Sequence, residues 1–152
     1  MNISSEKKRY GIDYKIVLNE DLGAFLNTLR KISNITIDDL LYENEIWDGP
    51  LTGLCLWNGE KYYFHSIEQY NKEYNLEKIP RPYFLIKLTD EQLINEELLH
   101  ADTVRYIESH PYVRKGHVST RPAAEWDKYY EACEKYPDQE VKQDQIVGWF
   151  EW

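Results

Sequence analysis

Residues 47–67 have the sequence "WDGPLTGLCLWNGEKYYFHSI", which predicts a β-hairpin that turns at Asn58 and Gly59. A two-residue type I′ turn needs positive φ at both central positions, and Asn followed by Gly is a favoured pair for it. Folding about this turn places Cys55 opposite Tyr62. Because side chains alternate between the faces of a strand, this single pairing sets the register of the whole hairpin.

The predicted hairpin has large apolar or aromatic side chains on both of its faces. One face is expected to hold Leu51, Cys55, Trp57, Tyr62 and Phe64, and the other Leu54, Leu56, Tyr63, His65 and Ile67. Such a hairpin belongs at the centre of a sheet, or it has helices on one face and a partner on the other. We expect one face to be core and the other to be at least partly an interface or the lining of a cleft.

Three segments precede the hairpin. Residues 14–18 predict a strand, and Asn19 is the expected N-cap of an amphipathic helix that ends near Asn34. Residues 35–47 suit either a short helix or a strand, because a possible capping box lies among β-branched and aromatic residues. The sequence leaves these two alternatives open.

Further elements follow the hairpin. Thr89 and Gln92 form a capping box at the start of one of the helices. The expected elements are a buried strand over residues 83–88, a helix over 90–110, a helix over 120–136 and a last strand over 145–152. The total is about five strands and three helices. We predict a single α+β domain over residues 1–152, with a mainly antiparallel sheet around a central hairpin at 51–67.

Composition and charge exclude several classes of protein. The chain has 152 residues and a formal net charge of −9, from 27 acids and 18 bases. Such a surface repels nucleic-acid phosphates and anionic membranes, and it attracts basic proteins such as nucleases. No run approaches the roughly 18 consecutive apolar residues of a transmembrane helix, and no apolar segment follows the basic N-terminus. We expect a cytoplasmic protein that binds neither nucleic acid directly nor membranes.

Searches for short motifs of common catalytic, nucleotide-binding and metal sites find none. Cys55 and Cys133 are too few for a zinc site or a disulfide framework, and we expect both to be buried. His117 and His65 are weak catalytic candidates, since acid–base chemistry would need them close together in the fold. We expect no cofactor and no metal, and the sequence weighs against an enzyme without deciding the question.

The loop over residues 111–122 is basic, although its neighbours in the sequence are acidic. Its bases and hydroxyls lie before the start of an expected helix, where unpaired N–H groups favour anions. The candidate anion-binding residues are Arg114, Lys115, His117, Thr120 and Arg121. The plainer interpretation is a solvated loop whose bases offset the charge of nearby acidic helices, with Thr120 as an N-cap.

The expected helix over residues 90–110 has many acidic residues. Its acids between residues 90 and 102 are Asp90, Glu91, Glu96, Glu97 and Asp102. They are too scattered to form a metal site by themselves. They form either an ordinary exposed face or a docking surface for a basic partner, whose association would be fast and sensitive to salt. We take Glu96, Glu97 and Asp102 as candidate interface residues.

Aromatic residues are abundant, with five Trp, 13 Tyr and four Phe. Tyr and Trp combine a large contact area with a polar tip, which protein interfaces favour. A chain of this size would have difficulty burying all of them. The aromatic candidates for an interface are Trp47, Tyr62, Tyr63, Trp149 and Trp152.

Three hypotheses for function follow from these features. The favoured one is a small acidic protein-binding module, such as an inhibitor of the immunity, antitoxin or anti-defence type, that acts on a basic partner. The second is a protein or hydrolase that binds a phosphate-bearing small molecule through the basic loop at 114–121. The third is a structural domain that forms a homodimer by pairing the edge of its C-terminal strand.

Overall fold

The computed structural model describes residues 12, 14–31, 35–44, 52–67, 82–109, 134–136 and 138–151; for residues 30–31 and 103–109 it describes the helix backbone alone. The chain divides into two compact units. The first comprises Met1–Lys15 and Asp90–Gln139, and the second comprises Ile16–Thr89 and Glu140–Trp152. The protein is of the α+β class that the sequence predicted.

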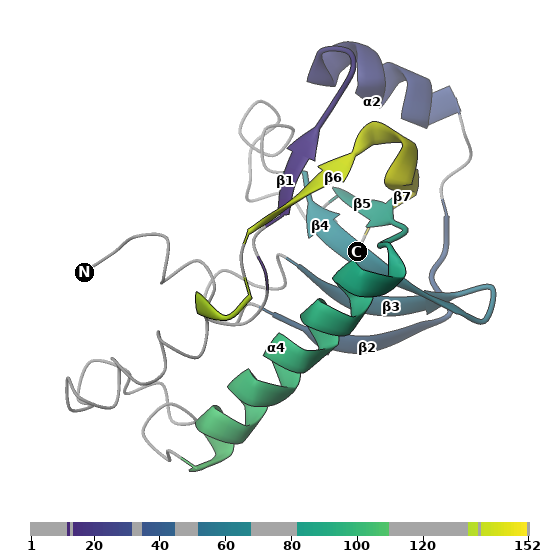
Figure 1. Cartoon of the computed structure of the whole chain (residues 1–152). Helices are drawn as coiled ribbons and strands as arrows, with labels where there is room; N and C mark the ends of the chain where they lie inside the picture. The colour runs from purple at the N-terminus through teal and green to yellow at the C-terminus, as the bar shows by residue number, and fades with distance from the viewer. Residues whose placement is uncertain are drawn as a thin grey trace, which may run out of the picture. The chain divides into compact units, whose positions relative to one another are not determined.

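The second unit contains a five-stranded antiparallel sheet (Figure 1). Its strands, in spatial order, are β2 (Asp39–Glu43), β3 (Thr52–Trp57), β4 (Glu60–Ser66), β5 (Pro82–Ile86) and β7 (Ile146–Glu151). The order places β3 and β4, the two strands of the predicted hairpin, in the interior of the sheet. The expectation of a central hairpin is therefore confirmed.

The hairpin has the predicted turn and the predicted register. Asn58 and Gly59 both have positive φ, at 53° and 77°. Cys55 lies opposite Tyr62, and the pairing continues without a shift from Trp57–Glu60 to Thr52–His65. The turn residues alone were enough to predict this register, because a two-residue loop leaves no slack between the strands.

Most side chains on both faces of the hairpin are buried, while Leu56, Trp57 and His65 are half-buried. The expectation that one face is partly an interface stays a prediction. On one face Cys55, Tyr62 and Phe64 belong to a core cluster with Tyr83, Leu85 and Phe150. On the other face Tyr63 is only 1% exposed. The aromatic rings pack against one another, as in the Tyr83–Phe150 stack at 5.3 Å between ring centroids. Most of the aromatic side chains of the hairpin therefore belong to the core.

Helix α2 (Leu22–Lys31) has an apolar face that packs on the sheet of its own unit. Phe25 is buried and its ring centroid lies 5.7 Å from that of Phe84. The N-cap is Asp21, whose Oδ1 accepts a hydrogen bond from the backbone N–H of Ala24 at 2.9 Å. The expectation that Asn19 caps this helix is wrong, because the helix begins at Leu22 and Asp21 directly precedes it. The backbone N–H of Asn19 donates to the side chain of Gln143.

The segment that suited either a helix or a strand forms strand β2. It pairs with β3, and a bulge at Leu41 lets Asp39 and Leu40 keep one register while Tyr42 and Glu43 take another. The local sequence suited both a helix and a strand, and pairing with β3 decided that this segment is a strand. The bulged Leu41 is exposed and lies between acids on this edge strand, a combination that limits pairing with other chains.

The C-terminal strand β7 pairs with β5, as predicted for residues 145–152. The short 3-10 helix η2 (Gln143–Gln145) precedes it and is held to the end of β5 by two hydrogen bonds between Lys87 and Gln145. Strands β1 (Tyr14–Val17) and β6 (Gln139–Lys142) form a separate two-stranded sheet. The strand expected at residues 14–18 is thus confirmed.

The described residues contain two helices, α2 and α4 (Asp90–Ser109), rather than the expected three. Helix α4 begins directly after Thr89, where the sequence predicted its start. The helix expected over 120–136 falls almost entirely outside the described residues. Neither of the two helices is long and apolar enough to cross a membrane.

Candidate functional site

The predicted anion site lies outside the described residues. This holds for all of its members, Arg114, Lys115, His117, Thr120 and Arg121. Trp47 and Trp152, expected in an interface, and Cys133 lie outside as well. The basic loop, and any approach of His117 to His65, therefore remain predictions from the sequence.

His65 has a structural environment in strand β4. Its Nδ1 lies 2.7 Å from the backbone oxygen of Ser66, and its ring is half-buried beside that of Tyr63. These contacts hold the ring within the sheet. They give His65 a structural role as a hydrogen-bonded histidine of the sheet.

The aromatic interface candidates of the sheet take part in the packing of their own unit. Tyr63 and Tyr62 are buried, at 1% and 8% exposure. Trp149 is half-buried, and its Nε1 donates to the backbone oxygen of Leu29 at 2.9 Å, which ties β7 to the last turn of α2. This bond also satisfies a carbonyl at the end of the helix.

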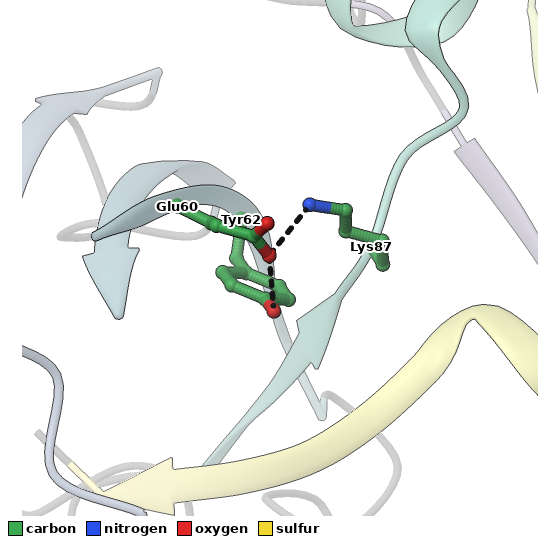
Figure 2. A network of polar contacts seen from close by, with 3 residues as sticks. All are labelled: Glu60, Tyr62 and Lys87. Atoms are coloured by element: carbon green, nitrogen blue, oxygen red, sulfur yellow. Dashed lines mark hydrogen bonds and ion pairs between the residues drawn. The ribbon is translucent and has the colours of Figure 1, made fainter. Parts of the chain in front are cut away.

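A polar group lies over Tyr62 near the turn of the hairpin (Figure 2). Glu60 accepts hydrogen bonds from Lys87 Nζ at 3.0 Å and from the Tyr62 hydroxyl at 3.2 Å. Lys87 Nζ also lies 4.9 Å from the centroid of the Tyr62 ring. The hydrogen bond and charge of Lys87 lower the pKa of Glu60, while burial and then the bond to Glu60 raise the pKa of Tyr62.

This group links the start of β4 to the residue that follows β5, across the ring of Tyr62. The Glu60 and Lys87 side chains are 61% and 46% exposed, and exposed ion pairs contribute little to stability. Trp57 packs edge-on against the same Tyr62 ring at 5.5 Å. Cys55, the other reactive group of this face, is fully buried, and burial raises the pKa of its thiol to about 12.

The acids of α4 differ in their environments. Asp90 and Glu91 are exposed, while Glu97 is half-buried. Asp102 is half-buried and accepts a hydrogen bond from the Tyr136 hydroxyl at 2.9 Å. These four residues remain compatible with the acidic surface predicted for this helix.

Glu96 is the exception, because it is completely buried instead of exposed. Its Oε2 accepts a hydrogen bond from the backbone N–H of Ile12 at 3.1 Å. One turn earlier, the backbone oxygen of Gln92 accepts a bond from the Tyr14 hydroxyl at 3.2 Å. Burial, together with the charge of Glu96, raises the pKa of Tyr14. Glu96 therefore holds the N-terminal segment to α4 and takes no part in an exposed acidic surface.

Ile94 and Leu98 are the residues of α4 that the sequence reasoning missed. They are 59% and 49% exposed, more than any other large apolar side chain that the structure describes. The sequence carried a weak signal for them, since an i, i+4 apolar pair lies among acids. Leu93 and Leu99 on the same helix concealed it, because apolar residues on several sides leave the packed face ambiguous.

Known proteins add no information about this arrangement. No protein-family model, curated protein or solved structure matches the chain. Among the described residues, no group of three or more His, Cys, Asp or Glu side chains could hold a metal ion. The inference of function therefore depends on surface charge and exposed apolar groups.

Proposed function

We propose that this chain is a protein-binding module that recognises a basic partner. The observation that carries the proposal is the charge of the second unit's surface. Its exposed acids, among described side chains, are Glu20, Asp21, Asp38, Asp39, Glu43, Glu60, Glu140, Asp144 and Glu151. The exposed lysines there are Lys61, Lys87 and Lys142. Among the exposed side chains that the structure describes in this unit, acids thus outnumber bases threefold.

Such an excess favours association with basic proteins in a specific physical way. A negative surface raises the rate of encounter with a positive one, and salt weakens this effect by screening. The same charge repels phosphates, which disfavours nucleic acid as a direct ligand. A module of this kind suits an inhibitor of the immunity, antitoxin or anti-defence type, which covers the positive surface of a nuclease or another nucleic-acid-binding protein.

The cytoplasm is the compartment that we propose for this module. Cys55 is a free thiol in the core, and free thiols persist in reducing compartments.

A binding panel tests the proposal directly. The immobilised chain is titrated with purified proteins of isoelectric point above about 9, including nucleases and DNA-binding proteins, at low and at high salt. We expect one member to form a saturable one-to-one complex whose association rate falls at least tenfold at high salt. Equal, weak binding to every basic protein would indicate non-specific attraction and would contradict the proposal.

The alternative, a phosphate-bearing ligand at the basic loop, has its own test. Thermal melting is measured with nucleotides, inorganic phosphate and simple anions, for the wild type and for an Arg114→Ala/Arg121→Ala variant. A ligand at 100 times its Kd raises stability by about 2.7 kcal/mol, which such melts resolve. A shift that the variant loses, together with no specific complex in the protein panel, would replace the proposed function with this alternative.

A further inference from the structure

Helix α4 buries two polar side chains and exposes two large apolar ones, which departs from the pattern of an ordinary surface helix. Gln92 and Glu96 lie one turn apart and are buried together with Leu99. The opposite side of the helix carries Ile94 and Leu98, which are about half exposed or more. Burying a carboxylate is costly unless it is hydrogen-bonded, and exposing two branched aliphatic side chains forgoes the gain of packing them.

We infer that the Ile94–Leu98 face of α4 is a docking surface for a basic amphipathic helix of a partner protein. The inference rests on the proposed function and adds to it the element that makes contact and the chemistry of the contacting segment. We call this surface the α4 stripe, and define it as Ile94, Leu98 and the exposed Ala101.

The positions of these residues define a continuous ridge. Ile94 and Leu98 are four residues apart and Ala101 follows three residues later, so all three lie along one side of the helix. A ridge with this i, i+4, i+7 spacing is the pattern by which one helix packs into the groove of another. The ridge matches the way in which helical segments are recognised, through anchors one turn apart.

Acids flank the α4 stripe on both sides. Asp90 and Glu97 are seven residues apart and lie along one flank, while Glu91 and Asp102 are eleven apart and lie along the other. Residues 90–104 contain no lysine or arginine. In paired helices, charged residues beside the apolar seam select the partner by opposite charge. The stripe therefore fits a helix with an apolar ridge between rows of lysine or arginine.

The same charges argue against a second copy of this chain as the occupant. Two copies of the stripe facing each other would bring acidic flanks against acidic flanks, and juxtaposed like charges oppose association. The span from Asp90 to Asp102 is about 18 Å along the helix axis, at 1.5 Å per residue. A partner segment of about three turns is sufficient to cover it.

A designed peptide provides the probe for this inference. The basic peptide has three heptads with leucine at the a and d positions and lysine or arginine at e and g, and a matched acidic peptide has glutamate at e and g. Affinity for the full chain is measured by fluorescence anisotropy at low salt. We expect the basic peptide to bind at least tenfold more tightly than the acidic one.

Variants of the stripe and its flanks assign the binding to α4. We expect Ile94→Ala/Leu98→Ala to weaken binding of the basic peptide at least tenfold, and Glu91→Gln/Glu97→Gln to reduce its salt dependence. Val147→Ala is the matched control, because Val147 is an exposed aliphatic residue on strand β7, and we expect less than a twofold effect. Circular dichroism melts confirm that each variant is folded. If Ile94→Ala/Leu98→Ala loses helix, Glu91→Gln/Glu97→Gln still tests the inference, because it keeps both apolar side chains.

The outcomes separate this inference from the proposed function. Equal affinity of the wild type and Ile94→Ala/Leu98→Ala, a preference for the acidic peptide, or no binding of the basic peptide would each overturn the inference. If the protein panel nevertheless yields a specific salt-sensitive complex, the proposed function stands without the α4 stripe. If the protein panel yields no specific complex while the basic peptide binds as expected, the inference about the α4 stripe is supported. The proposal that the partner is a basic protein of the kind in the panel is then wrong.

Discussion

Gly53 lies in β3 at a point where the sheet leaves no room for a side chain. A Cβ there would collide with the backbone oxygen of Tyr42 and with the ring of Phe64. Neither group can turn away, because one is backbone and the other is fully buried. We expect Gly53→Ala to lower the free energy of unfolding by about 3 kcal/mol, the upper end of the range for overpacked cores. Urea denaturation measures this loss.

Gly59 provides the control for that prediction. A Cβ at Gly59 would have nothing within 4 Å, but its φ of 77° is unfavourable for any residue with a side chain. We expect Gly59→Ala to cost about 1 kcal/mol, the usual penalty of the left-handed region. A loss at Gly53 no greater than the loss at Gly59 would contradict the pairing described between β2 and β3.

The ion pair of Glu60 and Lys87 predicts a specific dependence of stability on pH. Lys87 lowers the pKa of Glu60 in the folded state, so the folded chain binds protons at this carboxyl less readily than the unfolded chain. The resulting stabilisation is present above the unfolded-state pKa and is lost as pH falls through the lowered folded-state pKa. Lys87→Met keeps an apolar stem over Tyr62 but removes the charge.

We therefore expect the wild type to be slightly more stable than Lys87→Met at neutral pH, with the difference vanishing in acid. Denaturation curves of both proteins between neutral pH and about pH 3 test this. In parallel, an NMR titration should show that the pKa of Glu60 rises in the variant. A stability difference that is constant over the whole range would show that packing, and not the ion pair, is responsible.

At the scale of elements, helix α2 depends on Asp21 for its first turn. The carboxylate of Asp21 bonds the backbone N–H of Ala24, whereas Asn19 contributes only its backbone. We expect Asp21→Ala to cost about 1 kcal/mol, as for other N-cap residues, and Asn19→Ala to be close to neutral. Thermal melts of the two variants test the assignment of the cap. A larger loss of stability for Asn19→Ala than for Asp21→Ala would show that Asn19 is the N-cap.

The elements that could be predicted from the sequence are those that local chemistry determines. The Asn58–Gly59 turn permits one register, so the hairpin pairing follows from a few residues. Contacts between distant segments determined the features that the sequence did not predict. Strand β2 formed because β3 lies beside it, although its residues also suited a helix. Glu96 is buried because the backbone of Ile12, 84 residues away in the chain, reaches its carboxylate.

The candidate site was less predictable than the fold, for a related reason. The sequence showed that α4 is acidic. The buried face of the helix, however, is decided by contacts with other segments, which the residues of α4 alone do not predict. Leu99 is buried and Leu98 is exposed, although the two are adjacent and chemically the same. The basic loop at 114–121 lies outside the described residues, so the anion site there stays a prediction from the sequence.

At the scale of the whole molecule, we expect the chain to be a monomer in solution at low salt. The homodimer hypothesis needs the edge of β7 for pairing, but the backbone N–H of Ile35 already donates to the oxygen of Trp149 on that strand. The acid excess of the surface adds repulsion between copies. Light scattering coupled to size-exclusion chromatography should give the mass of one chain. A stable dimer at micromolar concentration would support the third hypothesis instead.

The central claim is that a basic partner binds the α4 stripe, and methyl NMR of the complex tests it most directly. Signals of Ile94, Leu98 and Val147 are followed while the basic protein selected by the binding panel is added to saturation. The account predicts large shifts or broadening for Ile94 and Leu98, which become buried, and an unchanged signal for Val147, which is exposed on β7. Unchanged Ile94 and Leu98 signals in a saturated complex would contradict it.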